Sequence, residues 1–149
     1  MAKENTAELA LNLGRQFIEM RYYLRRGMQQ KLKEQKIDIS FELLEIMALL
    51  WVKDGINQQE LADVATKDKS SMTYLINNLV KRRLVKRAEH KNDRRHKMIF
   101  VTGKGKLLRQ KIYPVVLELY EKAAINLKTT DMKNAFLLVK NMNENLKNQ

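Results

Sequence analysis

Apolar residues recur at the spacing of an α-helix through long stretches of this sequence, and few residues interrupt them. Near the N-terminus, leucine, phenylalanine and methionine return every three or four residues, which predicts a long first helix from about Thr6 to Lys33. The 149 residues include one proline and five glycines and contain no repeat and no low-complexity linker. A chain of this length can bury a sizeable core, so we expect one mostly helical domain spanning residues 1–149.

Polar residues at capping positions divide the remaining helical pattern into shorter segments. Ser40 is suited to cap a second helix over "FELLEIMALLW", and Asn57 a short third one, with Glu60 three residues later as in a capping box. Asp68 precedes a fourth helix, whose expected buried stripe consists of Met72, Leu75, Ile76 and Leu79. Only "ATK" separates the third helix from the fourth, so the two are predicted to form a helix-turn-helix, in which the second helix meets base edges.

A basic β-hairpin is predicted directly after the fourth helix. Between Val85 and Thr102 the sequence reads "VKRAEHKNDRRHKMIFVT", in which β-branched and aromatic residues alternate with polar ones and "HKND" supplies the turn. A long helix follows, which Pro114 is expected to kink, and a last helix starts after Thr129 or Thr130.

The net charge of +12 is confined to one segment of the chain. Residues 67–112 hold 15 Lys/Arg and 3 Asp/Glu, whereas residues 1–66 hold 9 and 10, and residues 113–149 hold 5 and 4. A confined basic block creates a directed potential that attracts polyanions, as in nucleic-acid-binding proteins. Basic helices also bind membranes, but the polar face of the fourth helix carries Ser, Thr and Asn rather than Trp or Leu, so we expect no membrane partner.

The residue types present exclude or disfavour several chemistries. The sequence has no cysteine, which excludes disulfides, cysteine-based zinc sites and thiol redox chemistry. Its longest apolar run, "IMALLWV", has only 7 residues, so we expect no membrane span, no signal peptide and a cytoplasmic protein. His90, His96 and Asp93 would lie on opposite arms of a mobile hairpin, which is a poor metal site, so we expect no metal and no cofactor. The sequence also has no Gly-rich phosphate loop and no histidine near Ser70 or Ser71, so we do not expect an enzyme.

Two segments resemble the MarR family of winged-helix transcriptional regulators. The segment "SSMTYLINNLVKRRLVKR" is similar to the family's recognition helix and its exit into the wing, and the order of elements resembles the family over the whole chain. The resemblance implies a mostly α fold with a small β-hairpin wing, in which a winged helix-turn-helix lobe at residues 38–102 is flanked by dimerisation helices at 1–37 and 103–149. The segment "DRRHKMIFVTGKG" resembles the wing pattern through Asp93, Arg94, Arg95, Ile99, Val101, Thr102 and Gly105.

Two positions depart from the family pattern. Relatives often have Gly where this chain has Arg83, and Gly would ease a left-handed helix end that costs other residues about 1 kcal/mol. We therefore expect the fourth helix to end differently, with Arg82 and Arg83 at the negative end of its dipole. The segment "HKND" also replaces the family's usual proline before the wing tip, which leaves the conformation of the wing open.

The resemblance and the polar face of the fourth helix together give a set of candidate DNA-contacting residues. Arg95 is the candidate for insertion into the minor groove, where A·T-rich sequence concentrates negative potential. DNA would repel an acid, so we interpret Asp93 as a support that braces an arginine or closes the turn. The residues expected to contact DNA are Lys69, Ser70, Ser71, Thr73, Tyr74, Asn77 and Lys81 on the helix, and Lys91, Arg94, Arg95 and Lys97 on the wing.

We expect a sequence-specific repressor of transcription that binds double-stranded DNA. Apolar stripes at both ends of the chain need a partner surface, which predicts a homodimer and therefore palindromic operators. The family often binds a small-molecule effector between the dimer helices and the winged helix. Met20, Met47 or Trp51 could line such a pocket, although no motif marks it and its residues are unknown. Two alternatives stay open: an architectural protein that coats nucleic acid without reading its sequence, and a small-molecule-binding helical dimer whose basic patch binds an acidic protein.

Overall fold

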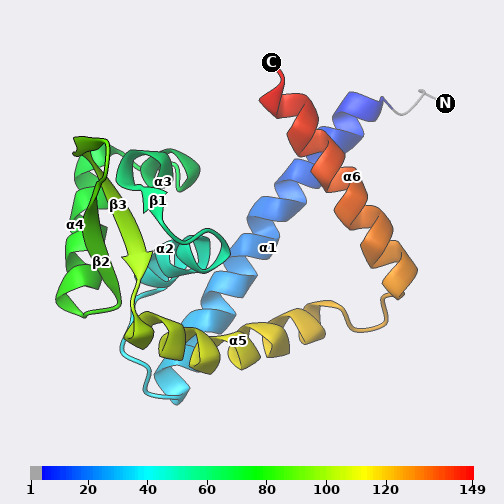
Figure 1. Cartoon of the computed structure of the whole chain (residues 1–149). Coiled ribbons are helices and arrows are strands. Elements are labelled where there is room, and N and C mark those ends of the chain that lie inside the picture. Colours follow the sequence, from blue (N-terminus) through cyan, green and yellow to red (C-terminus); the bar gives the residue numbers. More distant parts are fainter. Residues whose placement is uncertain (1–4) are drawn as a thin grey trace. The chain divides into compact units, whose positions relative to one another are not determined.

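The computed structural model describes residues 5–149, which form six helices and one small antiparallel sheet (Figure 1). The mostly helical class and the hairpin predicted from the sequence are confirmed. Two compact units make up the chain, one ending at Val116 and the other spanning Leu117–Gln149. In chain order the elements are α1 (Thr6–Glu34), α2 (Phe41–Val52), β1 (Ile56–Asn57), α3 (Gln58–Val64), α4 (Lys69–Lys81), β2 (Val85–His90), β3 (Asp93–Val101), α5 (Gly103–Ala123) and α6 (Thr129–Lys147).

Side-chain caps start the short helices where the sequence predicted them. The side-chain oxygens of Ser40, Asn57 and Asp68 accept from backbone N–H groups two or three residues later, at 3.2, 2.7 and 2.8 Å. Glu60 instead forms an ion pair with Lys53 at 2.6 Å, so its carboxylate does not serve as the second half of a capping box. The last helix begins at Thr129, one or two residues earlier than predicted, and Lys128 occupies the cap position without a side-chain bond.

The end of α4 contradicts the prediction. Arg83 has a φ of +59°, in the left-handed region, and the N–H groups of Arg83 and Leu84 donate to Val80 O and Leu79 O at 2.9 and 3.0 Å. This is the Schellman arrangement that glycine normally completes. The left-handed turn directs Leu84, which is 6% exposed, back into the core. The burial of that side chain and the two hydrogen bonds offset the backbone cost of about 1 kcal/mol.

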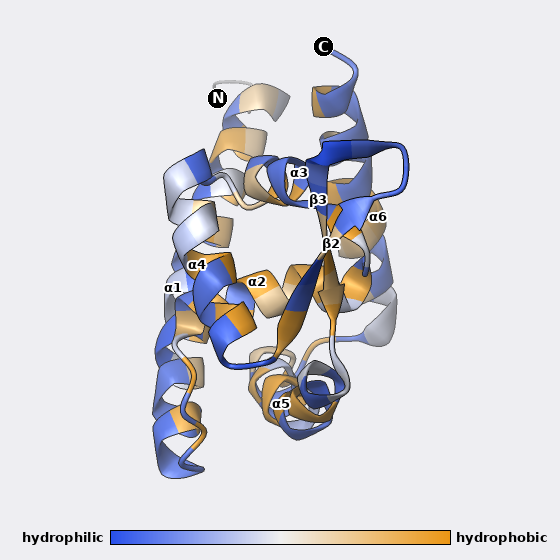
Figure 2. Cartoon of the chain, turned by 60° about the vertical axis from the view of Figure 1, so that its left-hand side comes forward, coloured by the Kyte–Doolittle hydropathy of each residue, from blue (hydrophilic) through white to orange (hydrophobic). Residues whose placement is uncertain are grey.

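The core of the first unit lies between α2, the helix-turn-helix of α3 and α4, and the sheet. The predicted stripe of α4 is buried, with Met72, Leu75, Ile76 and Leu79 each at most 3% exposed. Met47 and Leu50 of α2 are fully buried beside them, and each such side chain contributes about 1.5–3 kcal/mol to folding. Figure 2 shows α2 as largely hydrophobic and the tip of the β2–β3 hairpin as hydrophilic. Met47 is therefore a core residue.

The sheet has the strand order β1-β3-β2, and every pairing is antiparallel. Ile56 of β1 pairs with Ile99, and Val85 of β2 pairs with Val101. The register shifts after the Glu89–Lys97 pair, so the tip of the hairpin is irregular. We call the β2–β3 hairpin the wing. Its base is held by Asp54, whose Oδ1 accepts from Val101 N at 2.8 Å.

Helix α5 starts in contact with the base of the wing. Thr102 Oγ1 donates to Arg83 O at 2.6 Å and accepts from Gly105 N at 3.1 Å. Gly105 is buried, and its carbonyl accepts from the indole Nε1 of Trp51 at 3.2 Å. The helix then runs through Pro114 to Ala123.

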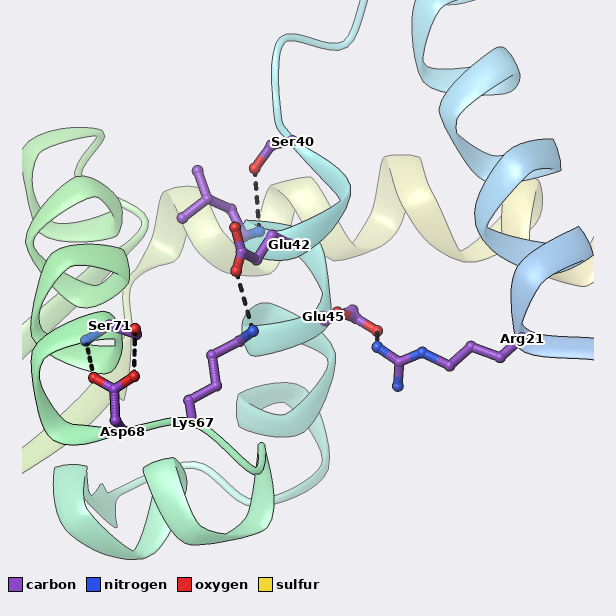
Figure 3. Close-up of polar contacts among 8 residues, drawn as sticks. Arg21, Ser40, Glu42, Glu45, Lys67, Asp68 and Ser71 are labelled. Atoms are coloured by element: carbon purple, nitrogen blue, oxygen red, sulfur yellow. Dashed lines mark hydrogen bonds and ion pairs between the residues drawn. The ribbon is translucent and has the colours of Figure 1, made fainter. Parts of the chain in front are cut away.

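Ion pairs join α2 to the elements on either side of it (Figure 3). Glu45 pairs with Arg21 of α1, and Glu42 pairs at 3.0 Å with Lys67 from the turn between α3 and α4. Exposed pairs of this kind contribute at most about 1 kcal/mol each. The Glu42–Lys67 pair helps to orient the helix-turn-helix on α2, and the Glu45–Arg21 pair helps to orient α1 on it.

Many large apolar side chains on the outer helices remain exposed. Within Leu117–Gln149, no described residue of α6 is buried, although Phe136 and Leu146 are 68% and 64% exposed. Leu9 and Phe17 of α1 are 46% and 41% exposed. Monomeric proteins rarely expose so much apolar surface, and each of these helices leaves large apolar side chains uncovered by its own unit.

Candidate nucleic-acid interface

A groove with a volume of about 540 Å³ runs between the helix-turn-helix and the wing. Four of the lining residues carry positive charge, and none of the described residues that line it is acidic. Such a groove concentrates positive potential and favours a polyanion. Its lining residues are Asn57, Gln58, Gln59, Ala62, Lys69, Met72, Thr73, Asn77, Arg87, Arg95, His96 and Lys97.

Two of the polar residues predicted to contact DNA are instead engaged within the protein. The Ser71 hydroxyl donates to Asp68 Oδ2 at 2.8 Å, beside the cap bond from Ser71 N (Figure 3). These bonds favour the carboxylate, so the pKa of Asp68 lies below its ordinary value. The Thr73 hydroxyl donates to Lys69 O at 2.9 Å and accepts from Gln58 Nε2 at 3.1 Å. Both hydroxyls therefore support the geometry of α4.

The other predicted residues of α4 lie on its exposed side. Lys69 and Asn77 are exposed and line the groove, whereas Ser70, Tyr74 and Lys81 are exposed outside it. Tyr74 is the most prominent of them, at 69% exposed. The helix thus presents two lysines, a serine hydroxyl, an amide and a phenol to solvent.

The predicted wing residues divide into two groups. Arg95 and Lys97 line the groove, whereas Arg94 and Lys91 lie outside its lining. The side chain of Arg94 is 92% exposed and lies 4.0 Å from Glu89. Asp93 Oδ1 accepts from Arg95 N at 2.9 Å, so this carboxylate shapes the backbone that carries Arg95.

Sequence reasoning missed the residues that join the wing to the helix-turn-helix. Arg87 Nε of β2 donates to Gln58 Oε1 at 3.1 Å, and His96 Nδ1 of β3 lies 2.9 Å from Asn57 Nδ2. Partial burial lowers the pKa of the Arg87 guanidinium, which still carries its charge in neutral solution. Asn57 was identified only as a cap, and no local pattern marks Gln58 or Arg87. Only the packing of distant segments reveals these contacts.

The histidines take part in hydrogen bonds of the wing. His90 Nδ1 accepts from Asn92 N at 3.2 Å, and His96 Nε2 lies 3.5 Å from Asp93 Oδ2. Among residues 5–149, no group of three or more potential ligands could hold a metal ion. In the same residues, no helix combines the length and apolar character needed to cross a membrane.

Comparisons with known proteins agree with this geometry. The sequence profile of the MarR family matches residues 39–97. BilQ, an HTH-type transcriptional regulator of Clostridium symbiosum, is 26% identical over 108 residues, which cover 72% of this chain and 75% of BilQ. A MarR transcriptional regulator from Methanosarcina mazei has a TM-score of 0.80 at 25% identity, covering 92% of this chain and 98% of that one. A mutant of Escherichia coli MarR in complex with operator DNA shares the fold, with a TM-score of 0.72 at 20% identity over 93% of this chain and 99% of that one. Residues 39–97 therefore match the MarR family of transcriptional regulators, and the chain has the winged-helix fold of these proteins.

Proposed function

We propose that this protein is a repressor that binds double-stranded DNA at palindromic operators as a homodimer, with a small-molecule effector controlling its affinity. The observation that carries the proposal is the groove between α4 and the wing, which has four cations and no acid among its described lining residues. Phosphates neutralise such a surface, and the released counterions favour binding. The relative from Escherichia coli was crystallised with operator DNA, which supports DNA as the polyanion.

In this proposal α4 lies in the major groove and the wing follows the adjacent minor groove. Asn77 has both a donor and an acceptor on an exposed amide, which suits the edge of an adenine. Arg95 enters the narrow minor groove, while Lys91, Arg94 and Lys97 bind phosphates. Lys69, Ser70, Tyr74 and Lys81 complete the contacts of the helix. Ser71 and Thr73 take supporting roles, because their hydroxyls are already engaged.

A homodimer is the second part of the proposal. The exposed apolar side chains of α1 and α6 need a partner surface, and a second copy of the chain offers a self-complementary one. Two-fold symmetry places two recognition helices about one turn of DNA apart, roughly 10 bp, which implies an inverted-repeat operator.

Effector control is carried over from the family resemblance. Of the three side chains considered for its pocket, Met47 is core and the indole of Trp51 bonds to Gly105 O, while Met20 is 42% exposed. A screen of small molecules by thermal shift, repeated with operator DNA present, tests this part. An effector should raise the melting temperature of the free protein and weaken its DNA binding.

Selection of bound sequences from a random DNA pool tests the proposal directly. We expect the selected sequence to be palindromic. A plot of the logarithm of its binding constant against the logarithm of the salt concentration should have a slope of about −5 to −9, for roughly 6 to 10 neutralised phosphates. Uniform recovery of all sequences would favour an architectural protein instead, and a slope near −1 would mean that the groove does not face DNA.

Two substitutions then separate base reading from charge attraction. Asn77→Ala should cost about 1–3 kcal/mol on the selected site and little on random DNA. Arg95→Ala should weaken binding to the selected site and to random DNA, most strongly where the DNA has A·T-rich flanking sequence. Arg109→Ala, an exposed arginine of α5 outside the groove lining, is the matched control for lost charge. If Arg95→Ala and Arg109→Ala behave alike, the wing is not a DNA-contacting element.

A further inference from the structure

Gln58 joins three elements of the winged helix through one amide side chain. Its Nε2 donates to Thr73 Oγ1 of α4 at 3.1 Å, and its Oε1 accepts from Arg87 Nε of β2 at 3.1 Å. Thr73 Oγ1 in turn donates to Lys69 O at 2.9 Å. A chain of three hydrogen bonds therefore runs from the wing, across the start of α3, to the first turn of α4. These elements are neighbours in Figure 1.

The direction of this chain is fixed by the chemistry of its members. Turning the Gln58 amide by 180° would set its NH₂ group against the N–H of Arg87, donor against donor. The same turn would leave the Thr73 hydroxyl without the donor that it accepts from. Because hydrogen bonds in a partly desolvated site reinforce one another, the chain holds β2 at one distance from α4.

Asn57 forms a second bridge, to the other strand of the wing. Its Oδ1 accepts from Gln59 N at 2.7 Å as the cap of α3, so its Nδ2 is the group that faces His96 Nδ1 at 2.9 Å. The ring nitrogen then accepts this bond. Two consecutive residues at the start of α3 thus contact both strands of the wing.

These bridges lie where the hairpin leaves the body of the unit. Pairing with β1 ends at Met98, and almost every residue of 88–97 is exposed. A two-stranded hairpin alone is only marginally stable in water. The orientation of the outer wing, which carries Arg95, therefore depends on side-chain contacts at its base.

We propose that Gln58 is a positioning residue for DNA binding, which fixes the wing relative to α4 so that Arg95 and Asn77 meet DNA together. The inference rests on the proposed function, and it adds a residue that does not touch DNA itself. Without the bridge the wing samples orientations in which Arg95 misses its groove, and the apparent affinity falls by the fraction of molecules that remain competent.

The test compares Gln58→Met with Gln30→Met on the selected operator. Methionine keeps the length of the side chain and removes both hydrogen bonds. Gln30 is the matched control, because it lies on α1 outside the groove lining and its side chain bonds to Glu34 Oε1 of the same helix at 2.9 Å. Gln58→Met should weaken operator binding about tenfold, as expected when one or two net hydrogen bonds are lost, and Gln30→Met should change it less than twofold.

Combining each glutamine variant with Arg95→Ala distinguishes a positioning role of Gln58 from a merely structural one. If Gln58 positions Arg95 on DNA, the fold-loss caused by Arg95→Ala should shrink to about twofold in the Gln58→Met protein and stay full in the Gln30→Met protein. Hydrogen exchange should accelerate at backbone amides of 88–97 in the Gln58→Met protein alone. Thr73→Val, which breaks the same chain at α4, should reproduce the non-additivity and serves if Gln58→Met does not fold.

The possible failures are distinct. If the natural sequence selects no DNA, the proposed function itself falls. If that sequence binds its operator but Gln58→Met and Gln30→Met bind it alike, the positioning role is overturned. Additive losses in the Gln58→Met, Arg95→Ala double variant would likewise overturn it, because they would show that the wing reaches DNA without the bridge.

Discussion

Replacing Gly105 with alanine is expected to destabilise the fold by about 2 kcal/mol. A Cβ at this position would lie 2.7 Å from Val101 Cγ1 and closer still to the carbonyl oxygen of Leu84, with Met47 Cε at 3.2 Å. The contacts with Leu84 O and Val101 Cγ1 are shorter than real Cβ atoms show, and both of these neighbours belong to the base of the wing. Overpacking of a core usually lowers stability by about 1–3 kcal/mol. Because a backbone oxygen can move aside less easily than a side chain, we expect Gly105→Ala to lie at the upper end of this range, at about 3 kcal/mol. The better helix propensity of alanine offsets about 1 kcal/mol of this cost, which leaves a net loss of about 2 kcal/mol.

Gly103 provides the matched control in the same helix. A Cβ there meets nothing within 4 Å, so Gly103→Ala should leave stability unchanged or raise it by up to about 1 kcal/mol. Both variants are compared with the natural sequence by urea unfolding and by thermal melts. For a chain of this size about 2 kcal/mol corresponds to roughly 4–8 °C, so Gly105→Ala should melt that much lower.

The same substitution should also weaken operator binding. The displaced groups, Leu84 O and Val101, belong to the two ends of the wing, so a shift there moves both strands. Equal midpoints for Gly103→Ala and Gly105→Ala would refute the reasoning, since they would show that the site accommodates a methyl group.

Three other predictions follow from single features of the structure. Arg83→Gly should raise the free energy of unfolding by about 1 kcal/mol and Arg83→Ala should not, because only glycine relieves the left-handed φ of +59°; a urea midpoint that does not move would contradict this. The pKa of Asp68 is lowered by its bonds to Ser71, so its contribution to stability is present above about pH 4 and is lost as the pH falls through the lowered native value. Asp68→Asn should therefore lose less stability on acidification than the natural sequence, measured by urea midpoints between pH 6 and pH 3. Light scattering at micromolar concentration should give about twice 17.6 kDa, and a monomer that binds one operator tightly would rule out the symmetric dimer.

Local interactions made much of the fold predictable. A helix cap joins groups two or three residues apart, so Ser40, Asn57 and Asp68 could be identified from the sequence before any packing was known. The apolar stripe of α4 could also be predicted from the sequence, because its period follows from helix geometry alone. The prediction for the end of α4 was wrong because only the cost of a left-handed φ at Arg83 can be read from the local sequence. The compensating gain, the burial of Leu84, depends on the tertiary structure.

The candidate site was predictable in its charge but less so in its contacts. Lys69, Asn77, Arg95 and Lys97 were identified from the sequence, and the structure brings them together in one groove. The hydroxyl of Thr73 was assigned to DNA because residue type does not distinguish a group that faces solvent from one that already bonds within the protein.

The sequence by itself determined the helical class, the helix starts, the basic hairpin and the segment that carries the positive charge. Each of these follows from periodicity, capping or composition, which act within a few residues. Only the tertiary structure decided which side chains bridge the wing and the helix-turn-helix. Gln58 and Arg87 are 29 residues apart and Asn57 and His96 are 39 apart, and they meet because the pairing of β3 with both β1 and β2 sets one register among many that the sequence pattern allows.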